Sequence, residues 1–490
     1  LLWSIANEAH EARLGELIEE IMPGVPYTLS HRIAPILREY RRASATAIDA
    51  SLKPLMQAHL TGMQTDLRDA GFTGDLLVST SVGGCQEVES LVERPINTLK
   101  SGPAIDVGLV RDNQLVYSRD SWRGPQWTGD IIGASTVDVR SVGAGGGSIA
   151  WVDPGGLLQV GPQSAGSVPG PACYGAGGTN PTVTDAALVL GYIDPEYFNG
   201  GRLTLDRDAA VNVITTLAKT MGKDVDETAH AILVIANELM IKAIGEITVN
   251  DGLNPRESVI VAGGGAAGFN IMPIAHELGC ATVILPQTAS ALSACGMQYS
   301  SIVFEATRSR FTDTNGFDRD GVNKALDEIE ADLMQFRDSL GTAIDATVTI
   351  EFFAEARYRA QVWELDTNLP KPRLKTDADV DELIETFHQT HERVYAVRDE
   401  GSPVECVNWK GRISIRPFDP PPAPDPSDAR NAPTPNATRS CFFGGNARVD
   451  TPVFRGEAMK IGDEVKGPAI IEEPTTTILS AAGDYILDCR

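Results

Sequence analysis

A glycine-rich run from Ser141 to Leu190 constrains this chain more than any other stretch. Glycine loses more entropy on ordering than any other residue. An ordered segment therefore keeps many glycines only for φ > 0 geometry or for amides that approach an anion. The run also holds two apolar, strand-like pieces, 148–152 and 157–160, and several prolines, which a featureless linker lacks. We therefore predict a packed loop system that lines a site, rather than a flexible linker.

Length and charge limit the class of protein. The 490 residues are enough for two to four domains, and 42% hydrophobic residues with 22% charged residues are ordinary for a globular chain. The net charge of −25 argues against nucleic-acid or anionic-membrane partners. No apolar run approaches the roughly 20 residues that span a bilayer. Seven scattered cysteines without a CxxC pair predict reduced thiols and a cytoplasmic protein.

Hydrophobic periodicity predicts an α/β protein with appended segments. Helices are expected at 9–21, in the stretch that ends near Gly71, and at 226–246, 321–339 and 379–395. The segment 257–287 reads as strand, glycine turn, helix and strand, which is one βαβ unit. We expect an α/β core at 1–310, an α+β domain at 311–418, a proline-rich connector at 419–438 and a small β-rich domain at 439–490.

The βαβ unit contains a second glycine loop. Gly263, Gly265 and Gly268 satisfy G-x-G-x-x-G between a strand and a helix, which is typical of dinucleotide sites. The second strand, however, ends in Pro286 and Gln287 instead of the acidic residue that would bind a ribose, so a dinucleotide is disfavoured. The same geometry suits the adenosine side of an actin-like ATPase. Tight strand–helix packing without a ligand is the alternative.

The first glycine loop, Gly143 to Ser148, could present successive amides to a phosphate. It lacks the lysine of a Walker A loop, so Mg²⁺ and carboxylates would have to balance phosphate charge, as in actin-like ATPases. Candidate carboxylates are Asp106, Asp138, Asp153 and Asp185. Asp185 stands at an expected helix start, where a plain capping role is an equal alternative.

Other reactive side chains carry weaker signals. Cys173 has no histidine close in sequence, which favours a buried structural thiol over a nucleophile. His388 and His391 lie three apart on an expected helix and could form a metal pair. No third ligand stands nearby, so a solvated helical face is favoured.

Three stretches closely resemble one known family. GAGGGSIAWVD, VGPQSAGSVPGPACYG and GGTNPTVTDA are similar to the central block of the hydantoinase A, 5-oxoprolinase and ketone carboxylase family. The resemblance is dense over residues 1–303 and looser beyond. IDASLKPLMQ, DLLVSTSVGG and the stretch from Ser121 to Gly156 look most similar to acetophenone carboxylase-type subunits.

The resemblance implies an actin-like, ribonuclease H-like ATPase core that uses ATP with Mg²⁺ or Mn²⁺ to phosphorylate a carbonyl or carboxylate oxygen. It implies a hetero-oligomeric complex with a hydantoinase B-like subunit. The implied activity is carboxylation of a ketone of the acetone or acetophenone type with bicarbonate. The alternatives are ATP-dependent opening of a lactam or hydantoin, and a non-catalytic scaffold subunit. The expected catalytic residues are Asp106 and Asp185, metal ligands stay unassigned, and the expected nucleotide-binding residues are Gly143, Gly145, Gly146, Gly147, Ser148, Gly263, Gly264, Gly265 and Gly268.

The chain departs from the family pattern at two places. Family members are expected to carry phosphate motifs of the DxGGT type, one before the position of Leu1 and one between Ile105 and Asp106. We expect that the chain lacks its original N-terminus and a segment at 105/106. Asp106 and Val107 would then be the last two residues of the second motif.

Overall fold

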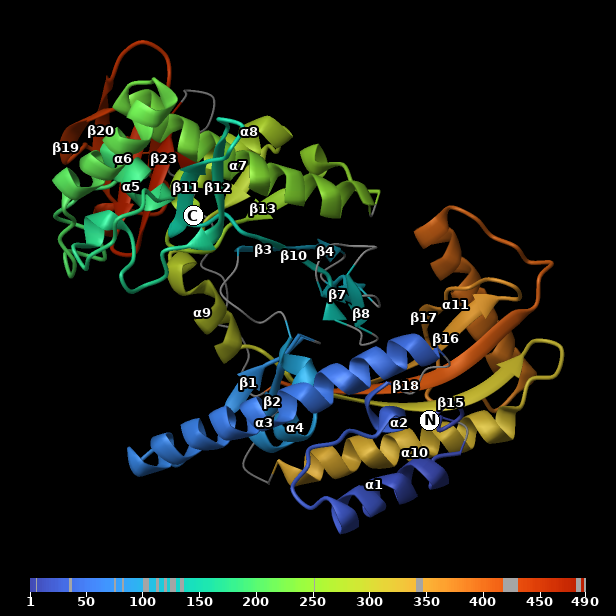
Figure 1. The fold of residues 1–490 in the computed structure, drawn as a ribbon. Helices are drawn as coiled ribbons and strands as arrows, with labels where there is room; N and C mark the ends of the chain where they lie inside the picture. Colours follow the sequence, from blue (N-terminus) through green and yellow to red (C-terminus); the bar gives the residue numbers. More distant parts are fainter. Residues whose placement is uncertain are drawn as a thin grey trace. The chain divides into compact units, whose positions relative to one another are not determined.

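The computed structural model describes residues 1–5, 7–34, 38–74, 76–81, 83–99, 105–111, 114–118, 121–123, 129–132, 136–250, 252–340, 347–416, 431–481 and 486–488. They form two compact units, each assembled from separate segments. Unit 1 comprises Leu1–Gly102, Tyr117–Val137 and Met297–Pro420, and unit 2 comprises Pro103–Val116, Asp138–Gly296 and Pro421–Arg490. Both units mix helices and strands, so the expected α/β character is confirmed (Figure 1).

A six-stranded sheet forms the centre of unit 1. Its order is β1 (Leu77–Ser79), β2 (Cys85–Glu87), β15 (Ile302–Asp313), β18 (Val404–Arg416), β16 (Thr347–Tyr358) and β17 (Leu365–Asn368). One face packs on α10 (Arg319–Ser339), which lies beside β15 in Figure 1, and on α11 (Asp377–Tyr395). Trp409 and Ile413 of β18 are fully buried on this face with Ile329 and Leu333 of α10. This apolar layer is the core of unit 1.

The N-terminal part of unit 1 is mainly helical. It contains α1 (Ala9–Ile21), α2 (Ser30–Ile33), the long α3 (Glu39–Asp69), α4 (Val88–Glu93), the 3-10 turn η1 (Pro95–Thr98) and the short strands β6 (Tyr117–Ser118), β7 (Ser121–Arg123), β8 (Asp130–Ile132) and β9 (Thr136–Val137). Asp49 of α3 is fully buried, and its carboxylate accepts from the Thr28 hydroxyl at 2.7 Å and the Ile96 amide at 3.0 Å. Burial raises the pKa of Asp49 in spite of these bonds. Asp49 therefore ties α3 to the segments on either side of it.

Four helices build the core of unit 2. They are α5 (Val183–Val189), α6 (Arg207–Met221), α7 (Val225–Asn250) and α8 (Ala267–Leu278). Ile232, Ala236 and Met240 of α7 recur at helical spacing and are buried in one cluster with α5 and α6. The periodicity read from the sequence at 226–246 therefore predicted both the helix and its buried stripe.

Short strands and turns complete unit 2. They are β3 (Ile105–Gly108), β4 (Val110–Arg111), β5 (Gln114–Leu115), β10 (Val139–Val142), β11 (Ser148–Val152), β12 (Leu158–Ser164), η2 (Ala172–Tyr174), η3 (Pro255–Glu257), β13 (Val259–Val261), β14 (Thr282–Ile284), η4 (Ala289–Ala291) and, at the boundary with unit 1, α9 (Leu292–Gln298). β11 and β12 form an antiparallel hairpin. β13 and β14 are parallel with α8 between them, which confirms the predicted βαβ unit.

The C-terminal strands belong to unit 2. β19 (Ala437–Cys441), β20 (Val449–Arg455), β22 (Ala469–Glu473) and β23 (Thr476–Ser480) form a sheet, and η5 (Gly456–Ala458), β21 (Glu464–Lys466) and β24 (Ile486–Asp488) accompany it. Tyr192 donates its hydroxyl to the Phe442 carbonyl at 2.7 Å, and Arg448 pairs with Asp226 of α7 at 2.5 Å. These contacts fasten the sheet to the helical core.

The units do not follow the four consecutive segments expected from the sequence. The expected core, 1–310, is divided because its first hundred residues pack in unit 1 with the strands β15 to β18. The expected β-rich segment packs in unit 2 against α8. Long-range strand pairing decides this division, and no local pattern records it.

Two simpler expectations concern membrane-spanning helices and thiols. Among the described helices, none has the length and apolar composition that a bilayer crossing requires. The six described cysteines are all free, and five of them are buried.

Candidate functional site

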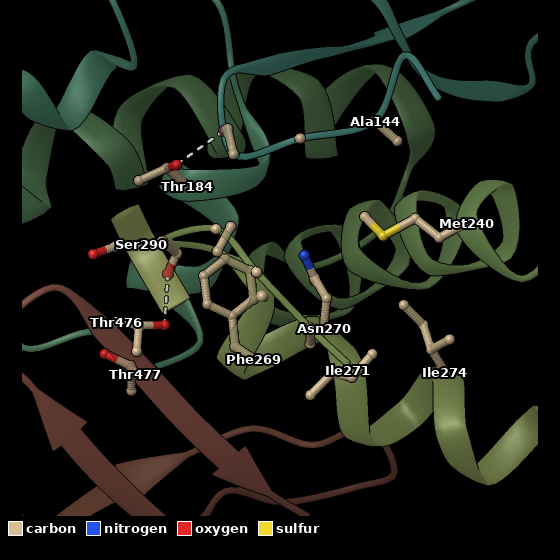
Figure 2. Close-up of a pocket in the computed structure, with 18 of the residues that line it drawn as sticks. Ala144, Thr184, Met240, Phe269, Asn270, Ile271, Ile274, Ser290, Thr476 and Thr477 are labelled. Atoms are coloured by element: carbon tan, nitrogen blue, oxygen red, sulfur yellow. Dashed lines mark hydrogen bonds between the residues drawn. The ribbon is translucent and has the colours of Figure 1, made fainter. Parts of the chain in front are cut away.

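Unit 2 contains a cavity of about 1130 Å³ whose wall includes both glycine loops (Figure 2). The first loop, 143–148, connects β10 to β11, and the second, 263–267, connects β13 to α8. The turn 474–475 between β22 and β23, with the first two residues of β23, closes a third side. Segments more than 300 residues apart in sequence therefore share one cavity.

The first loop is fixed from inside by Ser148. Its hydroxyl accepts from the Gly145 amide at 2.8 Å and donates to the Gly143 carbonyl at 3.1 Å. The Thr184 hydroxyl donates to the Gly146 carbonyl at 2.9 Å (Figure 2). A Cβ at Gly146 would lie 2.9 Å from the Thr184 hydroxyl oxygen, so this close approach requires glycine. The hydroxyl of Ser148, which was expected to bind a nucleotide, instead makes hydrogen bonds within the loop.

The second loop is fixed in a similar way. Gly264 has φ +113°, and its amide donates to the Ala289 carbonyl at 2.6 Å. The Thr476 hydroxyl donates to the Gly265 carbonyl at 2.9 Å (Figure 2). A threonine thus holds one carbonyl in each loop, and both threonines are buried.

Several backbone amides of the two loops have no hydrogen-bond acceptor in the described part of the chain. Within the described residues, the amides of Gly146, Gly147, Gly265 and Ala266 have no hydrogen-bond partner. Two of them precede α8, whose N-terminus carries partial positive charge. Clustered amides at a helix start bind phosphate and other anions. The two loops therefore have the chemistry of a phosphate site.

A more apolar region adjoins the loops. Met240, Phe269, Ile271 and Ile274 line it (Figure 2). Asn270 lies among them, 2% exposed, and its Oδ1 has no donor within the part of the chain that the structure describes. A buried amide oxygen without a donor costs free energy unless a ligand supplies one. A flat, apolar group that carries an N–H or O–H donor fits this region.

The cavity wall carries acidic side chains but, among its described residues, no lysine or arginine. Its three acids are Asp194, Glu472 and Glu473. Arg439 contacts both Asp194, at 3.1 Å, and Glu472, at 2.6 Å. Burial, and next the neighbouring Glu457, raises the pKa of Glu473, whose Oε2 has no partner within the described residues. In the described chain no three acid, histidine or cysteine side chains form a metal site.

Asp185, expected to be catalytic, has a different place. It is fully buried and accepts from the amides of Ala172, Cys173 and Thr182 at 2.8–3.2 Å, and from the Thr182 hydroxyl. Thr182 and Asp185 form a capping box at the start of α5. With no exposed surface, the carboxylate cannot touch a substrate in this geometry. The capping alternative holds, and Asp185 positions the 172–182 loop.

Of the remaining acids from the sequence analysis, Asp138 and Asp153 are not among the residues that line the cavity. Asp153 closes the β11–β12 turn by accepting from the amides of Gly155 and Leu157. Asp138 pairs with Arg140 at 2.8 Å. The side chain of Asp106, on β3, lies outside the described residues, so its catalytic role stays a prediction.

Two further expectations change. Gly268 does not line the cavity: a Cβ there would lie 2.2 Å from the Thr477 carbonyl, so this glycine serves helix–strand packing. His388 and His391 do not lie on a solvated face, since they are 7% and 2% exposed against Tyr358. Cys173 is buried as expected, and burial raises the pKa of its thiol.

The sequence did not point to several wall residues. They come from the ends of strands or from helix faces that look ordinary in isolation: Asp194, Met240, Phe269, Asn270, Glu472, Glu473 and Thr476. Only the repeated threonines of 475–477, next to a turn, offered a local signal.

These features define an α/β protein with two glycine loops that line one cavity. The sequence profile described as Hydantoinase/oxoprolinase matches residues 42–114 and 105–306, and the profile of its C-terminal domain matches residues 319–488. The chain belongs to the hydantoinase/oxoprolinase family, as the sequence resemblance indicated.

Individual relatives include several enzyme subunits. The chain is 32% identical to the caprolactamase subunit alpha of Pseudomonas jessenii, over 98% of this chain and 73% of the relative. It is 29% identical to the acetophenone carboxylase gamma subunit of Aromatoleum aromaticum, over 98% of this chain and 70% of the relative. The solved ATP-dependent caprolactamase of Pseudomonas jessenii matches at a TM-score of 0.78 and 31% identity, over 99% of this chain and 74% of that one.

The alignments also bear on the expected break at 105/106. The family profile matches in two pieces that overlap over residues 105–114. The alignment with the caprolactamase subunit has 518 positions against 490 residues here, so at least 28 of its positions have no counterpart in this chain. The overlap of the two matched pieces lies at the position where the sequence predicts a missing segment.

Proposed function

We propose that this chain is the nucleotide-binding subunit of an ATP-dependent enzyme, and that unit 2 carries the ATP site. One observation carries the proposal: two glycine loops, each held by a threonine, line one cavity and contain amides that have no acceptor within the described residues. The core would then be an actin-like, ribonuclease H-like ATPase fold. The ATP-dependent caprolactamase of matching fold supports this assignment.

In this proposal the two loops share the work of binding ATP. The amides of Gly146, Gly147, Gly265 and Ala266 bind phosphate oxygens, and the apolar region takes the adenine. Asn270 Oδ1 accepts a hydrogen bond from the adenine amino group or a ribose hydroxyl. Bound ATP supplies a phosphoryl group, and the amides stabilise negative charge as it develops on the transferred group.

The acceptor in the proposal is a carbonyl oxygen of the substrate. An enol or amide oxygen is a poor leaving group, and phosphorylation turns it into a good one. Asp106 is proposed as a carboxylate near the phosphates, and Asp185 as a residue that positions the loop. Mg²⁺ or Mn²⁺ is expected with ATP, although no three acid, histidine or cysteine side chains of the described residues form a site for it.

Two substrate classes fit this chemistry. A ketone would be carboxylated with bicarbonate, and the similarity to the acetophenone carboxylase gamma subunit supports this reading. A cyclic amide would be opened by hydrolysis, and the similarity to the caprolactamase subunit alpha supports that one. Relatives named as subunits support a hetero-oligomeric complex, for which we propose a hydantoinase B-like partner in the cytoplasm. A non-catalytic scaffold remains the third alternative.

Nucleotide binding is the first test. Titration of the purified chain with ATP and with a non-hydrolysable ATP analogue, followed by calorimetry, should give saturable binding. Substituting Asn270 by leucine should weaken ATP but leave inorganic triphosphate unchanged, because Asn270 adjoins the proposed adenine region. A chain that binds neither nucleotide, with or without Mg²⁺, would support the scaffold reading.

A second test separates the substrates. Release of ADP would be followed in the assembled complex with caprolactam, acetone and acetophenone, each with and without bicarbonate. ADP release that needs a ketone indicates carboxylation, whereas release with the lactam alone indicates ring opening. ADP release that responds to none of them would contradict both substrate classes.

A further inference from the structure

Two Asn-Gly pairs occur in the sequence, Asn199-Gly200 in unit 2 and Asn315-Gly316 in unit 1. An asparagine followed by glycine is especially prone to lose its side-chain amide, because glycine has no Cβ to obstruct the reaction. Both pairs lie in exposed turns and share this chemistry. They differ in the hydrogen bonds of the glycine amide.

The reaction is an attack of the backbone on a side chain. The glycine nitrogen gives its proton to water or hydroxide and bonds to the Cγ of the asparagine. The bond from Cγ to Nδ2 breaks, and the leaving NH₂ group takes up a proton from water and departs as ammonia. Water then opens the succinimide ring at either carbonyl, which gives aspartate or isoaspartate. A glycine amide that donates a hydrogen bond resists the attack, because that bond must break first.

The reacting amide of the unit 2 pair is free. Within the described residues, the Gly200 amide donates to no acceptor and the Asn199 side chain has no hydrogen-bond partner. The turn is closed by the amides that follow: Gly201 donates to the Phe198 carbonyl at 3.1 Å, and Arg202 donates to the Asn199 carbonyl at 3.3 Å. The nitrogen that must react is therefore the unbonded one in an otherwise bonded turn.

The backbone of this turn also suits the product. Asn199 has φ +54°, and Gly200 and Gly201 have φ +65° and +78°. Asparagine and aspartate adopt this left-handed conformation with less strain than most residues, so an aspartate can take the place of Asn199. The two glycines leave the backbone free of side chains that would oppose ring closure.

The unit 1 pair has the bond that the unit 2 pair lacks. The Gly316 amide donates to the Asp313 carbonyl at 3.2 Å, and the Asn315 amide donates to the Asp313 carboxylate at 2.9 Å. Arg359 pairs with that carboxylate at 2.5 Å and holds it in place. The Gly316 nitrogen can react only after this turn has opened, so the fold protects Asn315.

Asn199 is also part of the wall of the unit 2 cavity. The described wall already carries Asp194, Glu472 and Glu473, and it carries no lysine or arginine. Either product adds a carboxylate to this wall. That charge would oppose the phosphates of ATP, although its exposure to water and salt limits the effect to a few-fold change in affinity.

We infer that Asn199-Gly200 is a site of spontaneous deamidation in the folded chain, and that its conversion adds negative charge to the wall of the unit 2 cavity. Water is the co-reactant, and no enzyme is needed. The conversion depends on the turn alone, whereas its effect on ATP rests on the proposed function.

The experiment incubates the whole chain in mildly alkaline buffer and follows both pairs by peptide mapping with mass spectrometry. A parallel incubation in guanidinium chloride gives the rates of the unfolded chain, which should be equal at the two pairs. Folding should change the rate at Asn199 by less than about twofold and slow Asn315 about fivefold or more, because only Gly316 has a bond to break. A folded chain in which Asn199 converts no faster than Asn315 would overturn the site.

Variants test the added charge separately. Asn199→Asp carries one product from the start and should weaken ATP binding about threefold at low salt, and less at high salt. Asn315→Asp adds the same charge in unit 1 and should leave ATP affinity unchanged, so it is the matched control. Equal ATP affinities of the two variants would overturn the effect on the cavity. Absence of ATP binding in the unmodified chain would contradict the proposed function, but the conversion rates would still decide the site.

Discussion

The two cavities of this chain are built from different parts of the polypeptide. The unit 2 cavity is made largely of backbone, with carbonyls held by Thr184 and Thr476 and amides left unpaired. The unit 1 cavity, of about 1330 Å³, is made of charged and amide side chains on a sheet face and on facing helices, and some of them pair with one another, as Lys410 and Asn408 do with Glu355. Backbone amides allow the close approach that a phosphate needs, whereas side chains that already pair are less free to take a ligand.

The difference also governs how substitutions act. A glycine that faces backbone has no room for a Cβ, because a carbonyl held in a sheet or loop cannot move away. A glycine that faces a side chain leaves a neighbour that can shift slightly, although a buried β-branched neighbour in a helix shifts little. Gly268 of unit 2 should therefore tolerate a Cβ less well than Gly411 of unit 1.

The largest expected effect is the difference between the losses in the free energy of unfolding that Gly268→Ala and Gly411→Ala cause. The new Cβ at position 268 would lie 2.2 Å from the Thr477 carbonyl, while at position 411 it would lie 2.4 Å from the Cγ2 of Ile329. We expect a loss of about 3 kcal/mol in the free energy of unfolding for Gly268→Ala and about 1 kcal/mol for Gly411→Ala. Urea unfolding followed by circular dichroism measures both.

Gly245→Ala is the control for this pair. Gly245 lies inside α7 with nothing near a new Cβ, so the substitution should stabilise unit 2 by about 0.5–1 kcal/mol. Equal losses in Gly268→Ala and Gly411→Ala would contradict the distinction between backbone and side-chain neighbours.

The threonine anchors give the next largest effect. Thr184→Val and Thr476→Val keep the side-chain shape but remove the bond to Gly146 or Gly265. The released carbonyl should turn toward the phosphate, so ATP affinity should fall about tenfold, which corresponds to about 1.4 kcal/mol. Calorimetric titration with ATP measures this.

Thr216→Val supplies the comparison for the threonine anchors. Thr216 makes the same type of bond, to the Asn212 carbonyl, on the exposed face of α6. Its ATP affinity should equal that of the unmodified chain. If both anchor variants also bind ATP normally, the loops do not need their threonines. That result would contradict the proposal that the threonines preorganise a backbone site for ATP in unit 2.

The sequence predicted the backbone part of this molecule better than the side-chain part. Glycines that a packed segment needs are visible in sequence, and this made both loops predictable. The helices at 226–246 and 321–339 were also predictable, because their apolar stripes have the helical period. Gly268 was misassigned since G-x-G-x-x-G does not tell a glycine that faces a ligand from one that faces a strand.

The surroundings of the other residues could not be predicted from the sequence, because they depend on long-range packing. Asp185 was visible as a capping residue, but its complete burial depends on the 172–182 loop folding over it. His388 and His391 sit on an amphipathic helix, and only the pairing of β16 with β18 brings Tyr358 against them. Asn408 belongs to an ordinary alternating strand, so nothing local marks it as a wall of a cavity.

A buried histidine in unit 1 and a partly buried one in unit 2 should make the stability of each unit depend on pH. Burial, and next the positive charge of Arg398, lowers the pKa of His388 below 6.5. The unfolded chain then binds a proton that the folded chain does not, so stability is lost as the pH falls below 6.5. His388→Gln should flatten this slope in unit 1, and His230→Gln should do the same in unit 2, where burial lowers the pKa of His230.

Urea midpoints at pH 5.0, 5.5, 6.0, 6.5 and 7.5 measure these slopes. His59→Gln, on the exposed side of α3, should leave the slope unchanged. An unaltered slope in His388→Gln would mean that other groups carry the acid sensitivity of unit 1.

Exposed ion pairs should give the smallest effect, in both units alike. Lys242 and Glu246 lie 3.9 Å apart on α7 with side chains 74% and 52% exposed, and Arg319 pairs with the exposed Asp377 at 3.3 Å in unit 1. Water and salt screen such pairs, so Lys242→Gln and Arg319→Gln should each change the free energy of unfolding by less than about 0.5 kcal/mol. Urea unfolding at 0.05 and 0.5 M NaCl measures this. A larger loss confined to Arg319→Gln would mean that unit 1 depends on charge even at its surface, and not only around its cavity.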